Sequence, residues 1–462
     1  MAATRWTSVL IGRNGLGKSR MLGALASMFV DAANGKVVRD RRDHVPARVR
    51  YSIGEQICEL RTARNRELEA SLNGSPVAVE DLPLPSKVIA VSTTVLDKFP
   101  LPGRGSYEDA DSPEGVYTYL GLRDRTGRAS ATAVVYRALE ALMDASEATF
   151  ERRSRTSKIF EFLGYLPVVE HAYRWRYASL WHGDRTVLDL LNSDDVQLAA
   201  RSTAARLRRL VSREPNVLNR LQEAVDSARN VTSTKRELRL SVDFRGRGSS
   251  GRSEFDSLRL LRRAGLIELK SVELQTASGS IVDLREASSG ELSLATALLG
   301  IAAVIQDNAL VIVDEPEVSL HPEWQSQYLE LLEATFSEFR GCHFVVATHS
   351  PMIVADIAAE SANVVSLGRA DADTEPGSHF AGDSIDEILL RAFQVSGKNN
   401  LFLKQELVEA LRLAADGRTS SLRFAEIMAQ LSPVTESLKV SSPTRVLIEQ
   451  LQQVLETEAG SD

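Results

Sequence analysis

The sequence predicts an α/β fold with a mostly parallel sheet, an antiparallel piece and an inserted, mainly helical arm. Short apolar runs rich in β-branched residues are typical of buried parallel strands, and such runs stand at 8–11, 87–94, 309–313 and 343–348. Three of them end directly in glycine, carboxylate or histidine residues, at the strand ends where open parallel sheets bind ligands. Between about 128 and 230 the apolar residues instead recur at helical spacing.

The composition narrows the class of protein. Of 462 residues, 43% are hydrophobic and 25% charged, which is ordinary for globular domains. A net charge of −7 argues against a polycation that coats nucleic acid and leaves only local basic patches for such a role. Cys58 and Cys342 are the only cysteines, which argues against a zinc ribbon or disulfide scaffold and fits a reducing cytoplasm. We expect no membrane span, because no apolar run reaches the ~18 residues that one needs, and no signal peptide.

Composition shifts along the chain predict four regions. Residues 1–100 form a first lobe, which includes an antiparallel piece at about 48–63. A stretch rich in glycine, proline and acidic residues then opens a mainly helical insertion at 101–255. A second lobe follows at 256–382, and a helical segment at 383–462 completes the chain.

The first motif follows the apolar run at 8–11 and precedes a helical stretch. It fits G-x-x-x-x-G-K-[ST] without a gap and comprises Gly12, Arg13, Asn14, Gly15, Leu16, Gly17, Lys18 and Ser19. The glycines let backbone N–H groups wrap phosphates, and the helix N-terminus adds its dipole. We expect Lys18 to neutralise the β- and γ-phosphates of ATP and Ser19 to bind Mg²⁺. An ordinary glycine-rich turn is the structural alternative.

The second motif is a pair of carboxylates after the apolar run at 309–313. Asp314 and Glu315 end this predicted strand and are therefore expected beside the phosphate-binding loop. We expect Asp314 to hold Mg²⁺ through water and Glu315 to polarise the attacking water as a general base. The alternative is an acidic helix cap.

The third motif is His349, which follows the run at 343–348. At a strand end near the two carboxylates, this imidazole could contact a γ-phosphate, whereas an isolated histidine is more often structural. The fourth motif comprises Ser288, Ser289, Gly290 and Glu291 ahead of an apolar helix at 292–305. Considered alone, Ser288 and Glu291 form a capping box and predict only a helix start.

The order of these motifs resembles that of ABC-type ATPases. The wording "SSGE", "DEPEVSLHPEWQ" and "ATHSP" is most similar to the SMC/RecF/OLD-like group, including the Septu and retron-associated ATPases of bacterial anti-phage defence. The resemblance implies a P-loop NTPase with the ABC-ATPase head fold that binds and hydrolyses ATP with Mg²⁺. It also implies that two heads pair head-to-tail, so that Ser288 and Gly290 of one chain complete the ATP site of the other.

One feature of the family is missing. A glutamine is expected after the strand at 87–94, and none follows it. Asp97 stands nearby and is the candidate replacement, although "LDKFP" is equally compatible with a turn.

The resemblance favours an ATPase switch, a homodimer or higher oligomer that controls a separate effector protein such as a nuclease in anti-phage defence. The alternative is a DNA-repair or chromosome-maintenance ATPase that binds DNA directly. Arginines of the helical arm, among them Arg206, Arg209 and Arg213, are compatible with a DNA or RNA surface or with a solvated helix face. A transporter subunit is disfavoured by "EPEVSLHP" and by the insertion, so no membrane partner is expected.

Overall fold

A computed structural model describes most of the chain. The described residues are 5–13, 15–35, 48–63, 67–101, 115–123, 135, 137–139, 141–142, 150–192, 198–213, 216–231, 237–245, 252–284, 290–368, 372–395, 400–438 and 442–459. The chain divides into two compact units, of which unit 1 comprises residues 1–100 and 306–462 and unit 2 comprises residues 101–305. Among the described residues, no helix is both long and apolar enough to cross a membrane.

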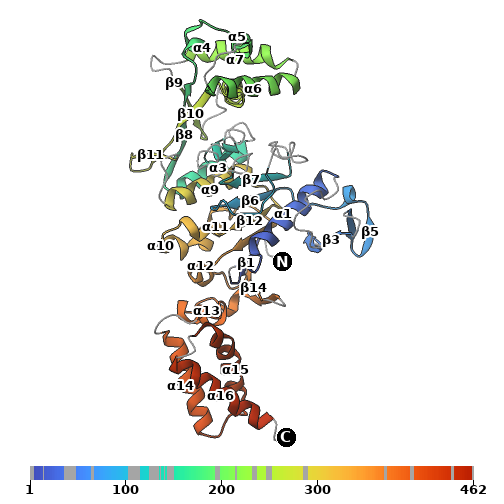
Figure 1. Cartoon of the computed structure of the whole chain (residues 1–462), viewed down its shortest axis with the longest axis vertical. Helices are drawn as coiled ribbons and strands as arrows, with labels where there is room; N and C mark the ends of the chain where they lie inside the picture. The colour runs from blue at the N-terminus through green and yellow to red at the C-terminus, as the bar shows by residue number, and fades with distance from the viewer. Residues whose placement is uncertain are drawn as a thin grey trace. The chain divides into compact units, whose positions relative to one another are not determined.

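Unit 1 is built on a mainly parallel sheet (Figure 1). Strands β14, β1, β13, β12 and β6 run parallel to one another, and β15 runs antiparallel to β14. All five residues of β6 and of β12 are buried, which explains their continuous apolar sequences. The strands predicted from the four apolar runs are therefore confirmed. Within unit 1, the order of the strands is β15 (Ala372–Pro376), β14 (Ala362–Leu367), β1 (Arg5–Ile11), β13 (Cys342–Ala347), β12 (Leu310–Asp314) and β6 (Val88–Ser92).

Helices follow the strands of this sheet. The longest of them is α1, which begins directly after the phosphate-binding motif. Short turns of helix follow β12 and β13, so these strands end in tightly folded segments. The bounds are α1 (Lys18–Ala33), η3 (Pro316–Ser319), α10 (Pro322–Gln325), α11 (Tyr328–Thr335) and α12 (Pro351–Ala355).

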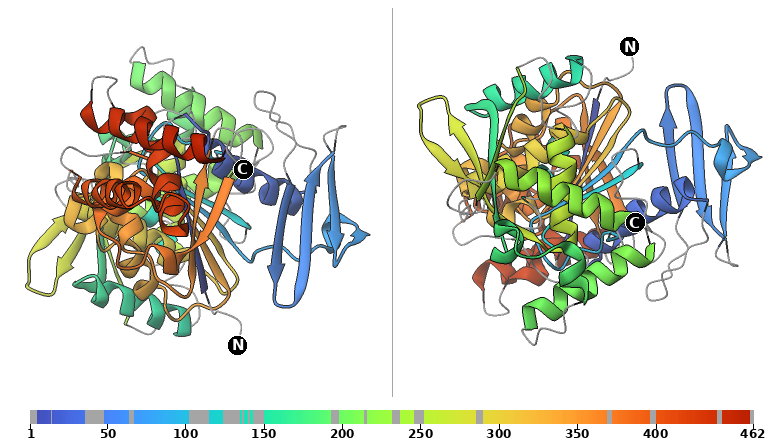
Figure 2. Two further views of the ribbon diagram at one scale, coloured as in Figure 1. Left: turned by 90° about the horizontal axis from the view of Figure 1, so that it is seen from below. Right: turned by 90° about the horizontal axis from the view of Figure 1, so that it is seen from above.

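A separate antiparallel sheet of unit 1 stands beside α1 (Figure 2). Its order is β2 (Arg48–Ile53), β3 (Gln56–Thr62), β4 (Leu68–Leu72) and β5 (Ser75–Val77), and η1 (Val79–Asp81) follows. Asn73 and Gly74 join β4 to β5 with φ angles of 51° and 84°. A two-residue hairpin with two positive φ angles is the turn that Asn-Gly favours. The predicted antiparallel piece is confirmed as β2 and β3.

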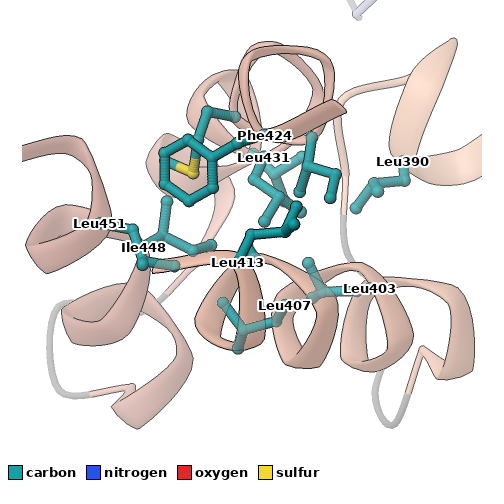
Figure 3. Packing of buried hydrophobic residues seen from close by; sticks show 12 residues of the cluster. Leu390, Leu403, Leu407, Leu413, Phe424, Leu431, Ile448 and Leu451 are labelled. Carbon is teal, nitrogen blue, oxygen red and sulfur yellow. The ribbon is translucent and has the colours of Figure 1, made fainter. Parts of the chain in front are cut away.

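The C-terminal part of unit 1 is helical and has its own apolar core (Figure 3). Side chains of α14, α15 and α16 pack together there, with Phe424 and Leu431 fully buried. The hydroxyl of Ser421 and the amide oxygen of Asn400 cap α15 and α14 by accepting backbone N–H groups. The elements are η4 (Gly377–His379), α13 (Ile385–Arg391), α14 (Leu401–Ala415), α15 (Leu422–Leu431), η5 (Ser432–Ser437) and α16 (Pro443–Ala459).

Unit 2 combines helices with an antiparallel sheet in the order β11-β10-β8-β9. The helical spacing between 198 and 228 corresponds to two helices, α6 and α7. The sequence pattern did not predict the antiparallel sheet of unit 2. Strand β8 pairs with β10, about a hundred residues away, and local periodicity does not show which distant segment a strand pairs with. The boundary predicted at 255–256 falls inside α8. The elements are β7 (Tyr117–Gly121), α3 (Phe150–Phe162), β8 (Tyr165–Trp175), α4 (Ala178–His182), α5 (Val187–Asn192), α6 (Leu198–Arg213), α7 (Val217–Val231), β9 (Glu237–Asp243), α8 (Arg252–Ala264), β10 (Ile267–Thr276), β11 (Ile281–Asp283) and α9 (Gly290–Val304).

Candidate active site

The register of the parallel sheet brings distant residues to one edge. Asp314, the last residue of β12, pairs with Ala347 of β13 on one side and with Ser92 of β6 on the other. Ala347 in turn pairs with Leu10 of β1, shortly before the phosphate-binding motif. Because these strands are parallel, the loops that follow them emerge at the same edge of the sheet.

The loop between β1 and α1 has the backbone that its glycines allow. Gly15 and Gly17 have φ angles of 85° and 96°, a region that residues with a Cβ rarely occupy. The first turn of α1 contains no acidic residue of its own, and the positive end of the helix dipole lies at this loop. This loop and helix start are therefore suited to an anion.

Lys18 is the central cation of the site. Its ammonium group donates to the carbonyl of Gly12 at 2.8 Å and lies 2.6 Å from Nε2 of His349. Burial lowers the pKa of Lys18, while the nearby carboxylates of Glu315, Glu317 and Asp314 oppose that shift. The lysine therefore bridges the phosphate-binding loop and the end of β13.

Ser19 and Asp314 form the candidate metal site. The hydroxyl of Ser19 donates to Oδ1 of Asp314 at 3.1 Å. Asp314 is only 1% exposed. Burial is the main cause that raises its pKa to about 7, and the charges of Glu315, Asp97 and Glu317 act in the same direction. A buried carboxylate beside other carboxylates is a place where a cation would relieve electrostatic repulsion.

Glu315 has an unusual backbone at the end of β12. Its φ and ψ angles are 50° and 57°, in the left-handed region that a residue other than glycine seldom adopts. The surrounding strands hold this conformation: the N–H of Glu315 donates to Ala347, and the hydroxyl of Thr93 donates to the carbonyl of Glu315 at 2.7 Å. Strain of this kind costs about 1–3 kcal/mol and is concentrated at functional positions.

The imidazole of His349 lies close to the side chains of both Lys18 and Glu315. Its Nε2 lies 3.8 Å from Oε1 of Glu315 as well as beside the ammonium of Lys18. Burial and the charge of Lys18 lower the pKa of His349, and Glu315 opposes the shift. This shift favours the neutral imidazole, to which the ammonium of Lys18 can donate a hydrogen bond.

Sequence reasoning missed two residues of this region, Glu317 and Gln325. The carboxylate of Glu317 accepts from the backbone N–H of His349 and from the hydroxyl of Thr348. The amide oxygen of Gln325 accepts from the hydroxyl of Ser350 at 2.7 Å. Both residues stand within the predicted "DEPEVSLHPEWQ" motif, but no local pattern shows that they bond to the strand end at 348–350.

The remaining predicted residues have different outcomes. Asn14, Ser288 and Ser289 lie outside the described residues. Gly290 is the first residue of α9 in unit 2, and the side chain of Glu291 is not described. Asp97 is 3% exposed and accepts the N–H of Phe99 at 3.0 Å.

Two further findings concern the loop that carries Asp97 and the arginines of the predicted helical arm. A Cβ at Gly23 of α1 would collide with the carbonyl of Lys98, so glycine permits the close approach of the loop that carries Asp97. In unit 2, the side chains of Arg206, Arg209 and Arg213 are not described.

Comparison with known proteins adds a family to this geometry. A family model described as "AAA domain, putative AbiEii toxin, Type IV TA system" matches residues 123–355, just over half of the chain. The chain belongs to this family of AAA domains. The matched region includes Asp314, Glu315 and His349, whereas the phosphate-binding loop lies ahead of it.

A curated relative of this AAA-domain protein is the Retron Vc95 probable ATPase of Vibrio cholerae serotype O1 biovar El Tor. The two are 29% identical over 99 residues, which is 19% of each chain, so the chain matches about a fifth of the length of this relative. The predicted similarity to retron-associated ATPases is confirmed.

Solved structures similar to this AAA-domain protein include an SMC head domain from Thermotoga maritima, at 11% identity and a TM-score of 0.34. That match covers 81% of this chain and 90% of the other. The recombination mediator RecF matches at 13% identity and a TM-score of 0.30, over 80% of this chain and 92% of the other.

Proposed function

We propose that this chain binds ATP with Mg²⁺ at the candidate active site and hydrolyses it to ADP and phosphate. The observation that carries the proposal is the convergence of an ammonium, a hydroxyl, two carboxylates and an imidazole beside a glycine-rich helix start. The five side chains are those of Lys18, Ser19, Asp314, Glu315 and His349. Phosphoryl transfer needs little beyond such positioning and electrostatic stabilisation.

The phosphate-binding loop would bind the phosphates of ATP, and two side-chain oxygens would bind Mg²⁺. The backbone N–H groups of the loop and the ammonium of Lys18 would bind the phosphates. The hydroxyl of Ser19 and the carboxylate of Asp314 are the hard oxygen ligands that Mg²⁺ prefers. Among the described residues, no cluster of three or more histidine, cysteine, aspartate or glutamate side chains could hold a metal. This fits an ion that is completed by phosphate and water oxygens and that, when bound, neutralises charge on the phosphates.

Hydrolysis would use Glu315 and His349. Water attacks the γ-phosphorus, the bond to the ADP oxygen breaks, and the carboxylate of Glu315 accepts the proton of the water. The strained backbone of Glu315 and its bonds to Thr93 and Ala347 support a fixed position for this base. A neutral His349 could donate a hydrogen bond to a γ-phosphate oxygen while Lys18 neutralises its charge.

The proposal includes a dimer. Ser288, Ser289, Gly290 and Glu291 would complete the ATP site of a second copy, with N–H groups at the start of α9 directed at the γ-phosphate. Helix α9 begins at Gly290, which supports a helix N-terminus at this motif. The ATP-bound form would then be a head-to-tail homodimer and the nucleotide-free form a looser state.

The biological role that we propose is that of the ATPase subunit of an anti-phage defence system that controls a separate effector, such as a nuclease. The Vibrio cholerae relative is named a retron "probable ATPase", and the family description reads "putative AbiEii toxin, Type IV TA system". The test is a phage challenge of cells that carry the gene for this chain together with its neighbouring genes. Protection should be lost with Lys18→Ala, and equal plaque counts with and without this substitution would refute the role of ATP in defence.

The enzymatic proposal is tested by phosphate release from Mg·ATP by the purified chain. A Lys18→Ala chain, purified in parallel, controls for contaminating ATPases. Release that depends on Mg²⁺ and exceeds the control is the expected result, and equal release by the two preparations would refute the proposal.

A further inference from the structure

Two side chains connect the segment that follows the carboxylate pair to the segment that carries His349. The first is Glu317 in η3, and it uses both of its carboxylate oxygens. Oε1 accepts the backbone N–H of His349, and Oε2 accepts the hydroxyl of Thr348 at 2.9 Å. The carboxylate therefore accepts hydrogen bonds from two consecutive residues, Thr348 and His349, just beyond the end of β13.

The second connection is Gln325, the last residue of α10. Its amide nitrogen donates to the carbonyl of Leu320 at 3.0 Å, and its amide oxygen accepts from Ser350 at 2.7 Å. The same hydroxyl of Ser350 accepts the N–H of Met352 at the start of α12. Residues 348, 349 and 350 are thus all tied to residues 317–325.

These bonds matter because the carboxylate of Glu317 is partly buried. Burial is the main cause that raises its pKa, and the hydrogen bonds from His349 and Thr348 oppose that shift. A carboxylate in such surroundings needs donors, since a buried charge without hydrogen bonds is costly. Displacement of residues 348–350 would leave the carboxylate of Glu317 without these hydrogen-bond donors, so the bonds hold both segments in place.

We propose that Glu317 is a positioning residue, which fixes the backbone of His349 so that its imidazole lies beside Lys18 and Glu315. The inference rests on the proposed function, because it assigns Glu317 a role that acts through His349. Glu317 and Gln325 flank residues 318–324, so a displacement of that segment would be transmitted to His349. Contact of this segment with another molecule could in this way alter the hydrolytic site.

A double-mutant cycle tests the role of Glu317 in the full chain. The variants are Glu317→Ala, His349→Ala and the double variant, with Glu330→Ala as a control for loss of an exposed glutamate on α11. Glu317→Ala should lower kcat by roughly 10–100-fold, the range expected for loss of hydrogen bonds to a charged group. The affinity for ATP should stay within about threefold, because the phosphate-binding loop is intact. In the His349→Ala background the same change should cost less than about twofold.

Glu317→Gln separates positioning from a role of the charge. Its amide oxygen can accept the N–H of His349, and its NH₂ group can donate to Thr348, so turnover should recover to within about fivefold of wild type. If Glu317→Ala does not fold, Thr348→Val gives a milder test. It removes the hydroxyl that donates to Glu317 and that accepts the N–H of Ser350, and it should lower kcat without changing ATP affinity.

Three results would overturn the inference. The first is multiplicative losses in the double variant. The second is a Glu317→Gln chain as impaired as Glu317→Ala. The third is wild-type turnover in both single variants, Thr348→Val and Glu317→Ala, or in Thr348→Val alone if Glu317→Ala does not fold. Multiplicative losses with a His349→Ala chain of reduced but measurable turnover would reject the positioning role alone. A fully active His349→Ala chain would also reject the part of His349 in the proposed function.

Discussion

The ammonium of Lys18 lies 2.6 Å from Nε2 of His349, although 331 positions separate the two residues in the chain. The same ammonium donates to the carbonyl of Gly12, so one cation joins the loop after β1 to the end of β13. An incoming phosphate would compete with Gly12 and His349 for the lysine N–H groups. Nucleotide binding is therefore expected to rearrange this contact.

Substitution of Lys18 should weaken ATP binding. Lys18→Ala removes the charge that faces the phosphates, and hydrogen bonds to charged groups contribute about 1.5–3 kcal/mol, so the Kd for Mg·ATP should rise roughly 10–100-fold. Titration calorimetry measures this change, with Lys404→Ala, an exposed lysine of α14, as the matched control. Equal affinities of the wild-type and Lys18→Ala chains would remove the lysine from the binding site.

Asp314 should make the nucleotide-free protein less stable as the pH rises. Burial raises its pKa to about 7, so the folded chain holds this proton more tightly than an unfolded aspartate does. The resulting stability is present at low pH and is lost between about pH 4 and pH 7. Asp314→Asn is neutral throughout, and at pH 8 it should exceed the wild type in free energy of unfolding by roughly 2–4 kcal/mol.

Urea unfolding at pH 5 and pH 8 without nucleotide measures that difference. The gap between Asp314→Asn and wild type should be smaller at pH 5, while Asp373→Asn, an exposed aspartate of β15, should match the wild type at both pH values. A gap that does not grow with pH would mean that Asp314 is ionised in the folded protein at low pH.

The strand ends that carry the candidate site were predictable from the sequence. Asp314 and His349 each follow a short, continuous apolar run, and the phosphate-binding loop has a fixed spacing of glycines, lysine and serine. Chemistry and spacing are local properties of the chain, so roles for these residues could be proposed without a structure. The convergence of these loops followed from one general rule about parallel strands.

The contacts between loops could not be predicted in the same way. Glu317 stands in a motif that was recognised, yet its bonds to Thr348 and His349 depend on how two loops fold back on each other. The sheet of unit 2 was missed for a related reason, since β8 and β10 pair across a long interval whose described residues include the helices α4 to α8. Pairing at such separations is decided by tertiary packing, to which local periodicity is blind.

A substitution at Ser288 tests whether the motif at 288–291 acts between chains. In the presence of ATP, a Glu315→Gln chain should accumulate as a head-to-tail dimer, and adding Ser288→Arg should abolish it, because arginine would crowd the γ-phosphate. Loss of a helix cap alone costs about 0.5–2 kcal/mol and would act within one chain. Light scattering measures the mass, and Ser278→Arg, at an exposed serine between β10 and β11, is the control. An ATP-induced dimer that tolerates Ser288→Arg would reduce the motif to a helix cap.

The most direct test of the central claim, hydrolysis of ATP with Glu315 as the base, is a comparison of turnover and ATP affinity in Glu315→Gln. Glutamine keeps the size of the side chain but cannot accept the proton, and loss of a general base typically costs ~10²–10⁴-fold in rate. Glu323→Gln makes the same chemical change at an exposed glutamate of α10 and should leave turnover unaltered. We predict that Glu315→Gln binds Mg·ATP as tightly as the wild type and releases phosphate at least ~100-fold more slowly. Near-normal phosphate release by Glu315→Gln would contradict the account.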